Sequence, residues 1–204
     1  MSWFSEKRIV ATKHNGTMEL NRFMGKWSLW AKDRTQESGP YIDAMWRNVF
    51  VEVKKRKVNV QRCLVLGVCL GGVFPLLHKA FPQARVLAID WDSELFLLGR
   101  DLGVWKSEAY LECLVGDVAT LVPHLEGFFD LVVIDLFTGH DVAPVVFNSM
   151  FQNILKQKLN DNAIVCVNAY EQPEVFGGWK TLFHEQKIMH YGTNDIGLFV
   201  SGAV

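Results

Sequence analysis

The N-terminal stretch alternates polar and apolar residues in the way that short antiparallel strands do. Residues 8–13 and 17–24 flank an Asn-Gly pair at 15–16, which favours a tight hairpin turn, and residues 27–32 form a third strand-like segment after a second turn at 25–26. A sheet of this size cannot bury both of its faces by itself. We therefore expect a small β-meander that packs on the rest of the chain.

From residue 60 onward the pattern changes to continuous apolar runs that alternate with helical spacing. Strands are expected at 63–66, 86–89, 111–115, 131–134 and 163–167, with an antiparallel pair at 188–191 and 197–200. Helices are expected at 41–55, 73–81, 93–102, 145–159 and 179–183. Apolar strands that alternate with helices are typical of a parallel sheet covered on both faces.

The predicted fold class is therefore α/β. We expect a Rossmann-like, doubly wound, mostly parallel sheet with antiparallel C-terminal strands, preceded by the small N-terminal β-meander. The two parts are predicted to span residues 1–42 and 43–204.

Composition narrows the function classes. Hydrophobic residues make up 50% of the 204 residues, enough for a full core. The 21 Lys and Arg residues nearly balance the 22 Asp and Glu residues, which argues against a nucleic-acid binder. No stretch approaches the roughly 18 apolar residues of a membrane span. The first residues lack the apolar core of a signal peptide, so we expect a cytoplasmic protein.

The cysteines and histidines give little sign of a metal site. None of the four cysteines belongs to a C-x-x-C pair, and three of them lie in apolar, strand-like runs. Reduced, buried thiols are the favoured interpretation, with metal binding left open. The six histidines are scattered without metal-ligand spacing, and we expect no metal.

The first candidate binding element is a glycine-rich turn between a predicted strand and a predicted helix. Gly67 allows a tight turn, and Gly71 and Gly72 would let a ligand approach the backbone at the positive end of the helix. The turn is neither a G-x-G-x-x-G motif nor a P-loop, so a plain strand-to-helix turn remains the alternative.

Two further strands end in acidic residues on the same edge of the sheet. Asp90 is placed to accept both hydrogen bonds from a ribose diol, and Trp91 beside it would stack on a nucleoside or simply pack. After the next strand, Asp117 can accept from an adenine amino group while the Val118 N–H serves a ring nitrogen, with Gly116 before them. A helix cap is the alternative for Asp117.

Asp135 ends the central strand, where the reacting group of a bound ligand should lie. A carboxylate at that place can orient an incoming amine or remove its proton. Asp135 is therefore the candidate catalytic residue.

The order of these features resembles the class I S-adenosylmethionine-dependent transferases, and more closely their spermidine synthase-like branch. That branch has an N-terminal β-meander, a Gln-Ser-Gly-type turn with a Tyr, matched here by residues 35–41, and an acidic strand end followed by a short loop and Pro, matched here by Asp135 and Pro144. The resemblance implies S-adenosylmethionine or its decarboxylated form as the cofactor, and a homodimer formed through the meander.

The resemblance also implies roles for residues that the pattern alone does not single out. If the meander folds over the cleft, Gln36 would contact the cofactor and Tyr41 the substrate. Thr138 and His140, in the loop past Asp135, are placed on the substrate side.

Two departures from the branch bear on the reaction. True aminopropyltransferases carry an Asp in the glycine turn that holds the donor's amine, and this chain has Leu70 there. Their catalytic loop has a second Asp, and this chain has Thr138 there. A polyamine in a dry pocket needs carboxylate partners, so we expect a protein that does not make spermidine. Leu70 would also spare intact S-adenosylmethionine a repulsion, which favours methyl transfer over aminopropyl transfer.

The predicted function is a transferase that binds S-adenosylmethionine or its decarboxylated form and passes a methyl or aminopropyl group to a small amine-type acceptor. The alternative is a non-catalytic nucleoside-binding or interaction module that retains the fold. An NAD-dependent oxidoreductase would share Asp90, but the tighter dinucleotide glycine pattern is missing. Neither nucleic acid nor membrane is an expected partner.

Overall fold

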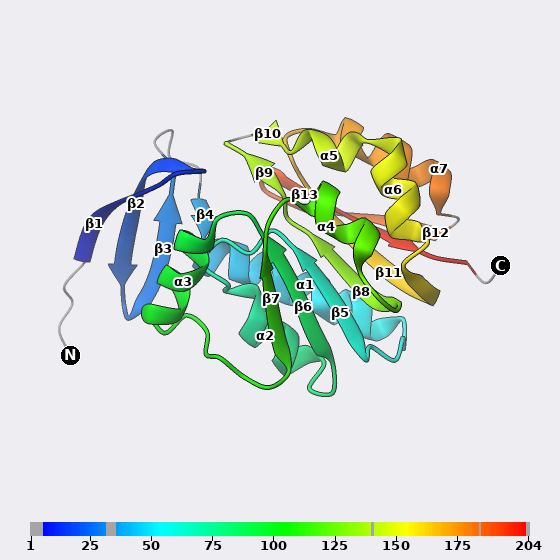
Figure 1. Ribbon diagram of the computed structural model, residues 1–204, viewed down its shortest axis with the longest axis horizontal. Coiled ribbons are helices and arrows are strands. Elements are labelled where there is room, and N and C mark those ends of the chain that lie inside the picture. Colours follow the sequence, from blue (N-terminus) through cyan, green and yellow to red (C-terminus); the bar gives the residue numbers. More distant parts are fainter. Residues whose placement is uncertain (1–5, 32–35, 140, 184, 203–204) are drawn as a thin grey trace.

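The computed structural model describes residues 6–31, 36–139, 141–183 and 185–202, apart from the side chains at 36, 37 and 185. A four-stranded antiparallel sheet lies beside a seven-stranded sheet that carries helices on both faces (Figure 1). A two-stranded hairpin, β9 (Phe137–Thr138) with β10 (Asp141–Val142), lies beyond the end of one central strand.

The four-stranded sheet is the predicted N-terminal meander with one strand more. Its strands run in the order β1-β2-β3-β4 and are β1 (Glu6–Thr12), β2 (Gly16–Phe23), β3 (Lys26–Trp30) and β4 (Gln36–Ser38). The short strand β4 was not predicted. It leads directly into α1 (Pro40–Lys55), so the meander ends at Ser38 and the predicted boundary at residue 42 falls inside a helix.

The larger sheet confirms the predicted α/β architecture. Its order is β12-β13-β11-β8-β5-β6-β7. The strands are β5 (Arg62–Leu66), β6 (Arg85–Asp90), β7 (Leu111–Val115), β8 (Phe129–Ile134), β11 (Leu159–Tyr170), β12 (Glu185–Tyr191) and β13 (Asn194–Val200). Strands β7, β6, β5, β8 and β11 are parallel, and β13 runs antiparallel to both β11 and β12.

Helices cover both faces because the strand residues alternate between two apolar cores. The core on one face includes side chains of α1 and α2 (Val73–Ala80), while α3 (Ser93–Asp101) packs Phe96 against it. The core on the other face includes α4 (Val118–Leu121), α5 (Pro144–Phe147), α6 (Ser149–Lys156) and α7 (Phe176–Leu182). Two 3₁₀ turns complete the described elements, at Val122–His124 and Pro173–Val175.

One predicted helix is wrong in its extent. The helix expected at 145–159 is two helices, because Asn148 between α5 and α6 has an extended backbone with ψ 115°. Its side chain accepts hydrogen bonds from the backbone N–H groups of Met150 and Phe151, which caps α6. The second helix ends at Lys156, and Leu159 already begins β11.

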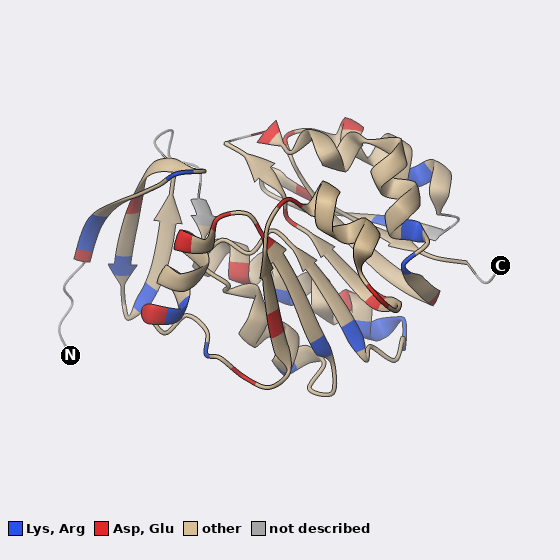
Figure 2. Ribbon diagram, in the orientation of Figure 1, with Lys and Arg blue, Asp and Glu red and all other residues tan. Residues whose placement is uncertain are grey.

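A crevice forms where the chain order reverses at the centre of the sheet. The chain leaves β5 toward β6 and β7 and then returns to β8 on the other side of β5. Ligands of such sheets bind beyond the carboxyl ends of the strands at this switch point. Acidic residues follow the strands at this edge, whereas β5 and β6 begin with Arg62 and Arg85 at the opposite edge (Figure 2).

Two further observations concern membranes and metals. None of the helices in the described ranges combines the length and the apolar character that crossing a bilayer requires. Within the same ranges, no group of three or more His, Cys, Asp or Glu side chains is placed to hold a metal ion. All four cysteines are free, and Cys63 and Cys166 are buried.

Candidate functional site

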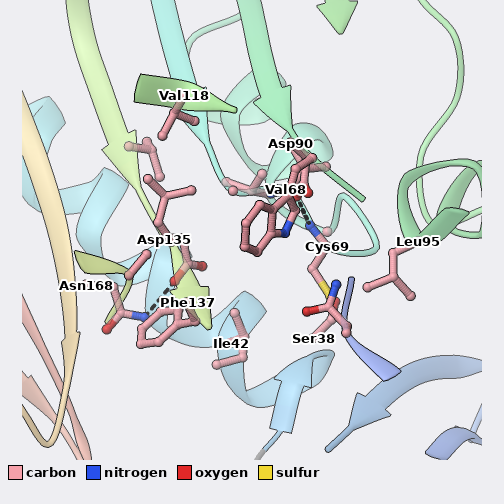
Figure 3. Close-up of a pocket in the computed structure, with 18 of the residues that line it drawn as sticks. Ser38, Ile42, Val68, Cys69, Asp90, Leu95, Val118, Asp135, Phe137 and Asn168 are labelled. Carbon is pink, nitrogen blue, oxygen red and sulfur yellow. Dashed lines mark hydrogen bonds between the residues drawn. The ribbon is translucent and has the colours of Figure 1, made fainter. Parts of the chain in front are cut away.

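A cavity of about 160 Å³ opens at the carboxyl edge of the seven-stranded sheet. Its walls come from the strand ends, from α1 and from the tip of the meander (Figure 3). Eight of the predicted site residues line it, namely Gly67, Gly72, Asp90, Trp91, Gly116, Asp117, Val118 and Asp135. The sequence therefore located the cavity and most of its strand-end residues.

Gly67 begins the turn between β5 and α2, as predicted. Its φ is +86°, in the left-handed region that favours glycine. A Cβ atom there would lie 2.1 Å from the backbone oxygen of Asp135, so no side chain fits. The Gly67 N–H donates to the Ile89 carbonyl at 3.0 Å. The glycine thus brings the ends of β5, β6 and β8 together.

Asp90 holds the glycine turn through backbone hydrogen bonds. Its Oδ2 accepts from the N–H groups of Val68 at 2.6 Å and Cys69 at 3.1 Å (Figure 3), and its Oδ1 accepts from Asp92 N–H at 2.8 Å. Burial raises the pKa of Asp90, and these three hydrogen bonds act against that rise. A carboxylate has about four acceptor positions. About one remains for a ligand, whereas the predicted contact with both ribose hydroxyls would use two.

Asp117 is the N-cap of α4, which was the alternative to adenine binding that the sequence left open for this residue. One carboxylate oxygen accepts from the Ala119 N–H at 2.9 Å. The side chain is exposed at the cavity and its second oxygen has no hydrogen bond within the described ranges. Val118, 6% exposed, forms the adjoining wall. Capping uses one oxygen and leaves the other for a ligand, so the two interpretations are compatible.

The tip of the meander closes one side of the cavity at Trp91. The His14 ring stacks on Trp91 with the centroids 5.2 Å apart and the planes 25° apart. Thr12 and Asn15 donate side-chain hydrogen bonds to Asp92, each at 2.5 Å. Trp91 is 41% exposed and lines the cavity together with Asn15. Trp91 therefore both packs and faces the cavity.

Asp135 lies in the interior, and only its cavity side is accessible. Its Oδ1 accepts from Asn168 Nδ2 at 2.8 Å (Figure 3), and its Oδ2 accepts from Trp46 Nε1 at 2.9 Å. Burial raises the pKa of Asp135 most strongly; the two hydrogen bonds oppose that rise and the nearby charge of Asp90 adds to it. Both donors are neutral, so no cation among the described side chains compensates the Asp135 charge.

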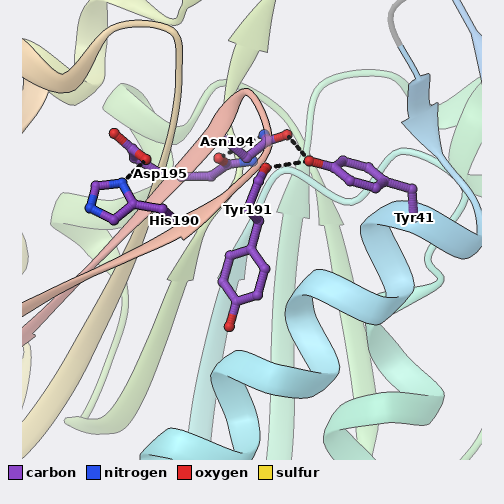
Figure 4. A network of polar contacts seen from close by, with 6 residues as sticks. Tyr41, His190, Tyr191, Asn194 and Asp195 are labelled. Atoms are coloured by element: carbon purple, nitrogen blue, oxygen red, sulfur yellow. Dashed lines mark hydrogen bonds and ion pairs between the residues drawn. The ribbon is translucent and has the colours of Figure 1, made fainter.

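A chain of hydrogen bonds continues from Asp135 to the β12–β13 hairpin. Asn168 Oδ1 accepts from Asn194 Nδ2 at 3.0 Å, and Asn194 Oδ1 accepts from the Tyr41 hydroxyl at 3.3 Å. The same hydroxyl donates to the Tyr191 carbonyl (Figure 4). Tyr41 therefore reaches the hairpin and is not among the residues that line the cavity, and its predicted contact with substrate stays a prediction.

Three other predicted residues lie outside the cavity lining. Leu70 is 1% exposed, because it packs with an apolar cluster between the meander and α3. Gly71 is covered by Trp105, whose Cδ1 would lie 2.5 Å from a Cβ atom on the glycine. Thr138 is exposed on β9, opposite Asp141 of β10. None of the three is among the residues that line the cavity, and their predicted contacts with cofactor or substrate stay predictions.

Two predictions fall on parts of the chain that are not described. His140 lies outside the described residues. The backbone of Gln36 pairs with Trp30 in the meander, and its side chain lies outside the described part. Their roles stay predictions.

The structure adds four residues that sequence reasoning missed. Trp46 and Asn168 hold Asp135, Asn15 comes from the meander tip, and Asp43 comes from the first turn of α1. Asn168 carried a usable signal, since it is a polar residue near the carboxyl end of an apolar strand. Asp43 carried no such signal, because acidic residues are common in the first turn of helices, where they interact favourably with the helix dipole.

The cavity is acidic. Four aspartates line it, and no Lys, Arg or His belongs to its lining among the residues that the structure describes; the four are Asp43, Asp90, Asp117 and Asp135. Buried carboxylates without cationic partners are costly. The lining therefore suits a ligand that carries positive charge.

Comparison with solved structures identifies the fold. A spermidine synthase in complex with the transition state analogue AdoDATO superimposes with a TM-score of 0.76 at 12% identity, over 96% of this chain and 73% of that one. A probable spermidine synthase from Corynebacterium glutamicum gives 0.68 at 14% identity, over 97% and 77%. Human methyltransferase-like protein 13 in complex with SAH gives 0.62 at 16% identity, over 80% of each chain.

At these identities the likeness establishes the fold alone. The chain has the S-adenosylmethionine-dependent methyltransferase-like fold, and the predicted resemblance is confirmed at that level. No protein-family model matches the sequence. No curated protein matches it either.

Proposed function

We propose that this protein is a transferase that binds S-adenosylmethionine or its decarboxylated form and alkylates a small amine. The acidic cavity at the switch point of the sheet carries the proposal, because its described lining contains four aspartates and no basic side chain. Both candidate donors and a protonated amine are cations. The fold, shared with structures whose ligands are named SAH and AdoDATO, supports the same class of ligand.

The residues at the β6 and β7 ends fit a nucleoside. Asp90 keeps about one acceptor position for a ribose hydroxyl, and the second oxygen of Asp117 can accept from an adenine amino group. Trp91 and Val118 supply apolar contact surface beside them. When bound, the sulfonium donor supplies a carbon activated for displacement by a nitrogen nucleophile.

Asp135 lies where the acceptor amine would approach. The described residues offer its charge no cationic partner, so an incoming ammonium would be attracted and oriented there. Burial raises the pKa of Asp135, which makes it a better base than an exposed aspartate. In the reaction the ammonium first gives a proton to Asp135 or to water, which frees the nitrogen lone pair. A C–N bond then forms as the C–S bond breaks, with the electron pair of the C–S bond going to sulfur.

The choice between methyl and aminopropyl transfer loses its sequence argument. The preference for methyl transfer depended on Leu70 facing the donor, and Leu70 is buried in the cluster between the meander and α3. Thr138 is exposed and likewise gives no information on the acceptor. Both donors therefore stay within this proposal, as does the predicted homodimer.

Binding of 5′-methylthioadenosine, a neutral nucleoside, tests the first half of the proposal. We expect saturable binding by calorimetric titration, and a several-fold loss in Asp117→Ala because one carboxylate hydrogen bond is removed. Asp161→Ala, at an exposed position of β11, is the matched control and should bind like the parent chain. Absence of binding to the parent chain, or equal binding by both variants, would contradict the assigned nucleoside end.

Turnover separates the transferase from the non-catalytic module. The chain is incubated with each donor and a set of small amines, and the thioether product is measured by mass spectrometry. Product that depends on an added amine supports the transferase. Nucleoside binding with no product from any amine would favour the module.

A further inference from the structure

We propose that Asp43 recognises a positively charged amine on the tail of the donor, and thereby selects decarboxylated over intact S-adenosylmethionine. This inference rests on the proposed function and assigns a specificity-determining residue to it. Neither the predicted site nor the fold comparison singles out Asp43.

Asp43 faces the middle of the cavity. Along the carboxyl edge of the sheet the strand order places Asp117 and Asp90 on one side of β5 and Asp135 on the other. Asp43, from α1, lies over the turn that follows β5, because a Cβ atom on Gly72 would lie 2.5 Å from its Oδ1. A ligand that extends from the nucleoside end to Asp135 must pass this carboxylate.

Asp43 differs from the other three cavity aspartates in having no committed hydrogen bond. Asp90 accepts from three backbone N–H groups, Asp117 from one, and Asp135 from two side chains. Within the described ranges no donor is hydrogen-bonded to the Asp43 carboxylate, and no Lys or Arg forms an ion pair with it. It is also only partly exposed. A partly desolvated carboxylate without a donor gains most from a charged ligand group.

The cationic neighbours of Asp43 do not replace such a ligand. Arg47 and Lys26 lower the pKa of Asp43, but burial has the larger effect and leaves that pKa raised. Helix α2 begins beside the Asp43 carboxylate, and the partial positive charge at the helix N-terminus stabilises the negative charge of Asp43. That interaction stabilises the helix and does not distinguish one ligand tail from another.

The tail of the donor is the group that meets Asp43. In an adenosyl sulfonium the chain between the sulfur and the end of the molecule bears an amine, and intact S-adenosylmethionine bears a carboxylate beside that amine. The amine would be attracted by Asp43 and the carboxylate repelled, in a cavity with no basic side chain in its described lining. Asp43 thus supplies the negative charge that the glycine turn, with Leu70 buried, does not.

The test compares three ligands on the parent chain and on Asp43→Asn. The ligands are decarboxylated S-adenosylmethionine, intact S-adenosylmethionine and 5′-methylthioadenosine, which has neither the tail amine nor a charge. Affinities are measured by calorimetric titration. We expect the parent chain to favour the decarboxylated donor, and Asp43→Asn to lose about tenfold or more of that affinity. The affinity for intact S-adenosylmethionine should change less in Asp43→Asn, because the substitution removes both the attraction of Asp43 for the donor amine and its repulsion of the donor carboxylate.

Controls keep this inference separate from the proposed function. Methylthioadenosine should bind both chains equally, and Asp101→Asn, which removes an exposed carboxylate at the end of α3, should match the parent chain with all three ligands. If methylthioadenosine does not bind the parent chain, the proposed function fails. If it binds both chains equally and Asp43→Asn keeps the parent affinity for the decarboxylated donor, only the Asp43 inference is overturned. A urea unfolding curve of Asp43→Asn shows whether the variant is folded.

Discussion

Asp90 and Asp135 occupy equivalent places in the sheet and are held in different ways. Asp90 is the last residue of β6 and Asp135 directly follows β8, each lines the cavity, and burial raises the pKa of each. Backbone N–H groups of two neighbouring loops hold Asp90. Side chains of α1 and β11 hold Asp135, and β13 and α1 support them in turn.

The difference lies in what each set of partners can do when the carboxylate changes. A backbone N–H can only donate, so the partners of Asp90 need an acceptor at that place. The amides of Asn168 and Asn194 can exchange oxygen for nitrogen by rotating, and the Tyr41 hydroxyl can accept as well as donate. The chain of hydrogen bonds behind Asp135 can therefore run in either direction. We therefore expect the stability of the fold to depend more on Asp90 than on Asp135.

Asp90→Ala should give the largest effect. Three backbone N–H groups lose their acceptor at once, and hydrogen bonds to a charged group contribute roughly 1.5–3 kcal/mol each. We expect the free energy of unfolding to fall by about 3 kcal/mol or more, measured by urea denaturation. Asp117→Ala, which removes one such bond, should lose about 1 kcal/mol. Equal losses in the two variants would show that Asp90 does not hold the turn.

The pH dependence of stability should reveal the burial of Asp135. Because its folded-state pKa is raised, the native state binds a proton more readily than the unfolded state. Its contribution to stability is therefore present at low pH and is lost as pH rises through the raised pKa. We expect the stability of the parent chain minus that of Asp135→Asn to decline as pH rises from about 4 in the absence of ligand. A difference that is flat or rises with pH would contradict the burial of an uncompensated charge.

Asp135→Asn at neutral pH should give the smallest effect. The new amide can donate to Asn168 Oδ1 once Asn168 and Asn194 have rotated, and its oxygen still accepts from Trp46 Nε1. Removing a buried charge offsets the cost, so we expect a change within about 1 kcal/mol. Asp135→Ala leaves both donors without an acceptor and should lose about 2 kcal/mol. If Asn is as damaging as Ala, the chain of amides does not reverse.

The same contrast explains how far the sequence could predict the site. Asp90, Asp117 and the glycine turn depend on contacts between consecutive elements, so strand ends and spacing were enough to find them. The partners of Asp135 come from elements far apart in the chain, and Trp46 and Asn194 carry no local sign of that role. Leu70 was misplaced for a related reason, since only the docked meander shows that an apolar turn residue is covered.

The fold itself was predictable to the level of its layers. Apolar runs gave the five central strands, while the short strand β4 and the break at Asn148 were missed. Strand β4 has three residues, too few for alternation to show. Asn148 interrupts an otherwise helical spacing with a cap that only its backbone conformation reveals.

Aspartates gather around the cavity at the carboxyl edge of the sheet and give this edge a local negative field. The formal net charge of −1 does not describe this field, because Asp90 ends β6 and Asp117 and Asp135 follow β7 and β8. The opposite edge carries both signs, with Arg62, Arg85 and Asp130. Salt screens this field beyond about 8–10 Å under physiological conditions. The acidic edge attracts a cationic ligand only at short distances, and it does not attract a neutral nucleoside by its charge. How fast a charged ligand finds the cavity is thus a matter of ionic strength as well as of shape.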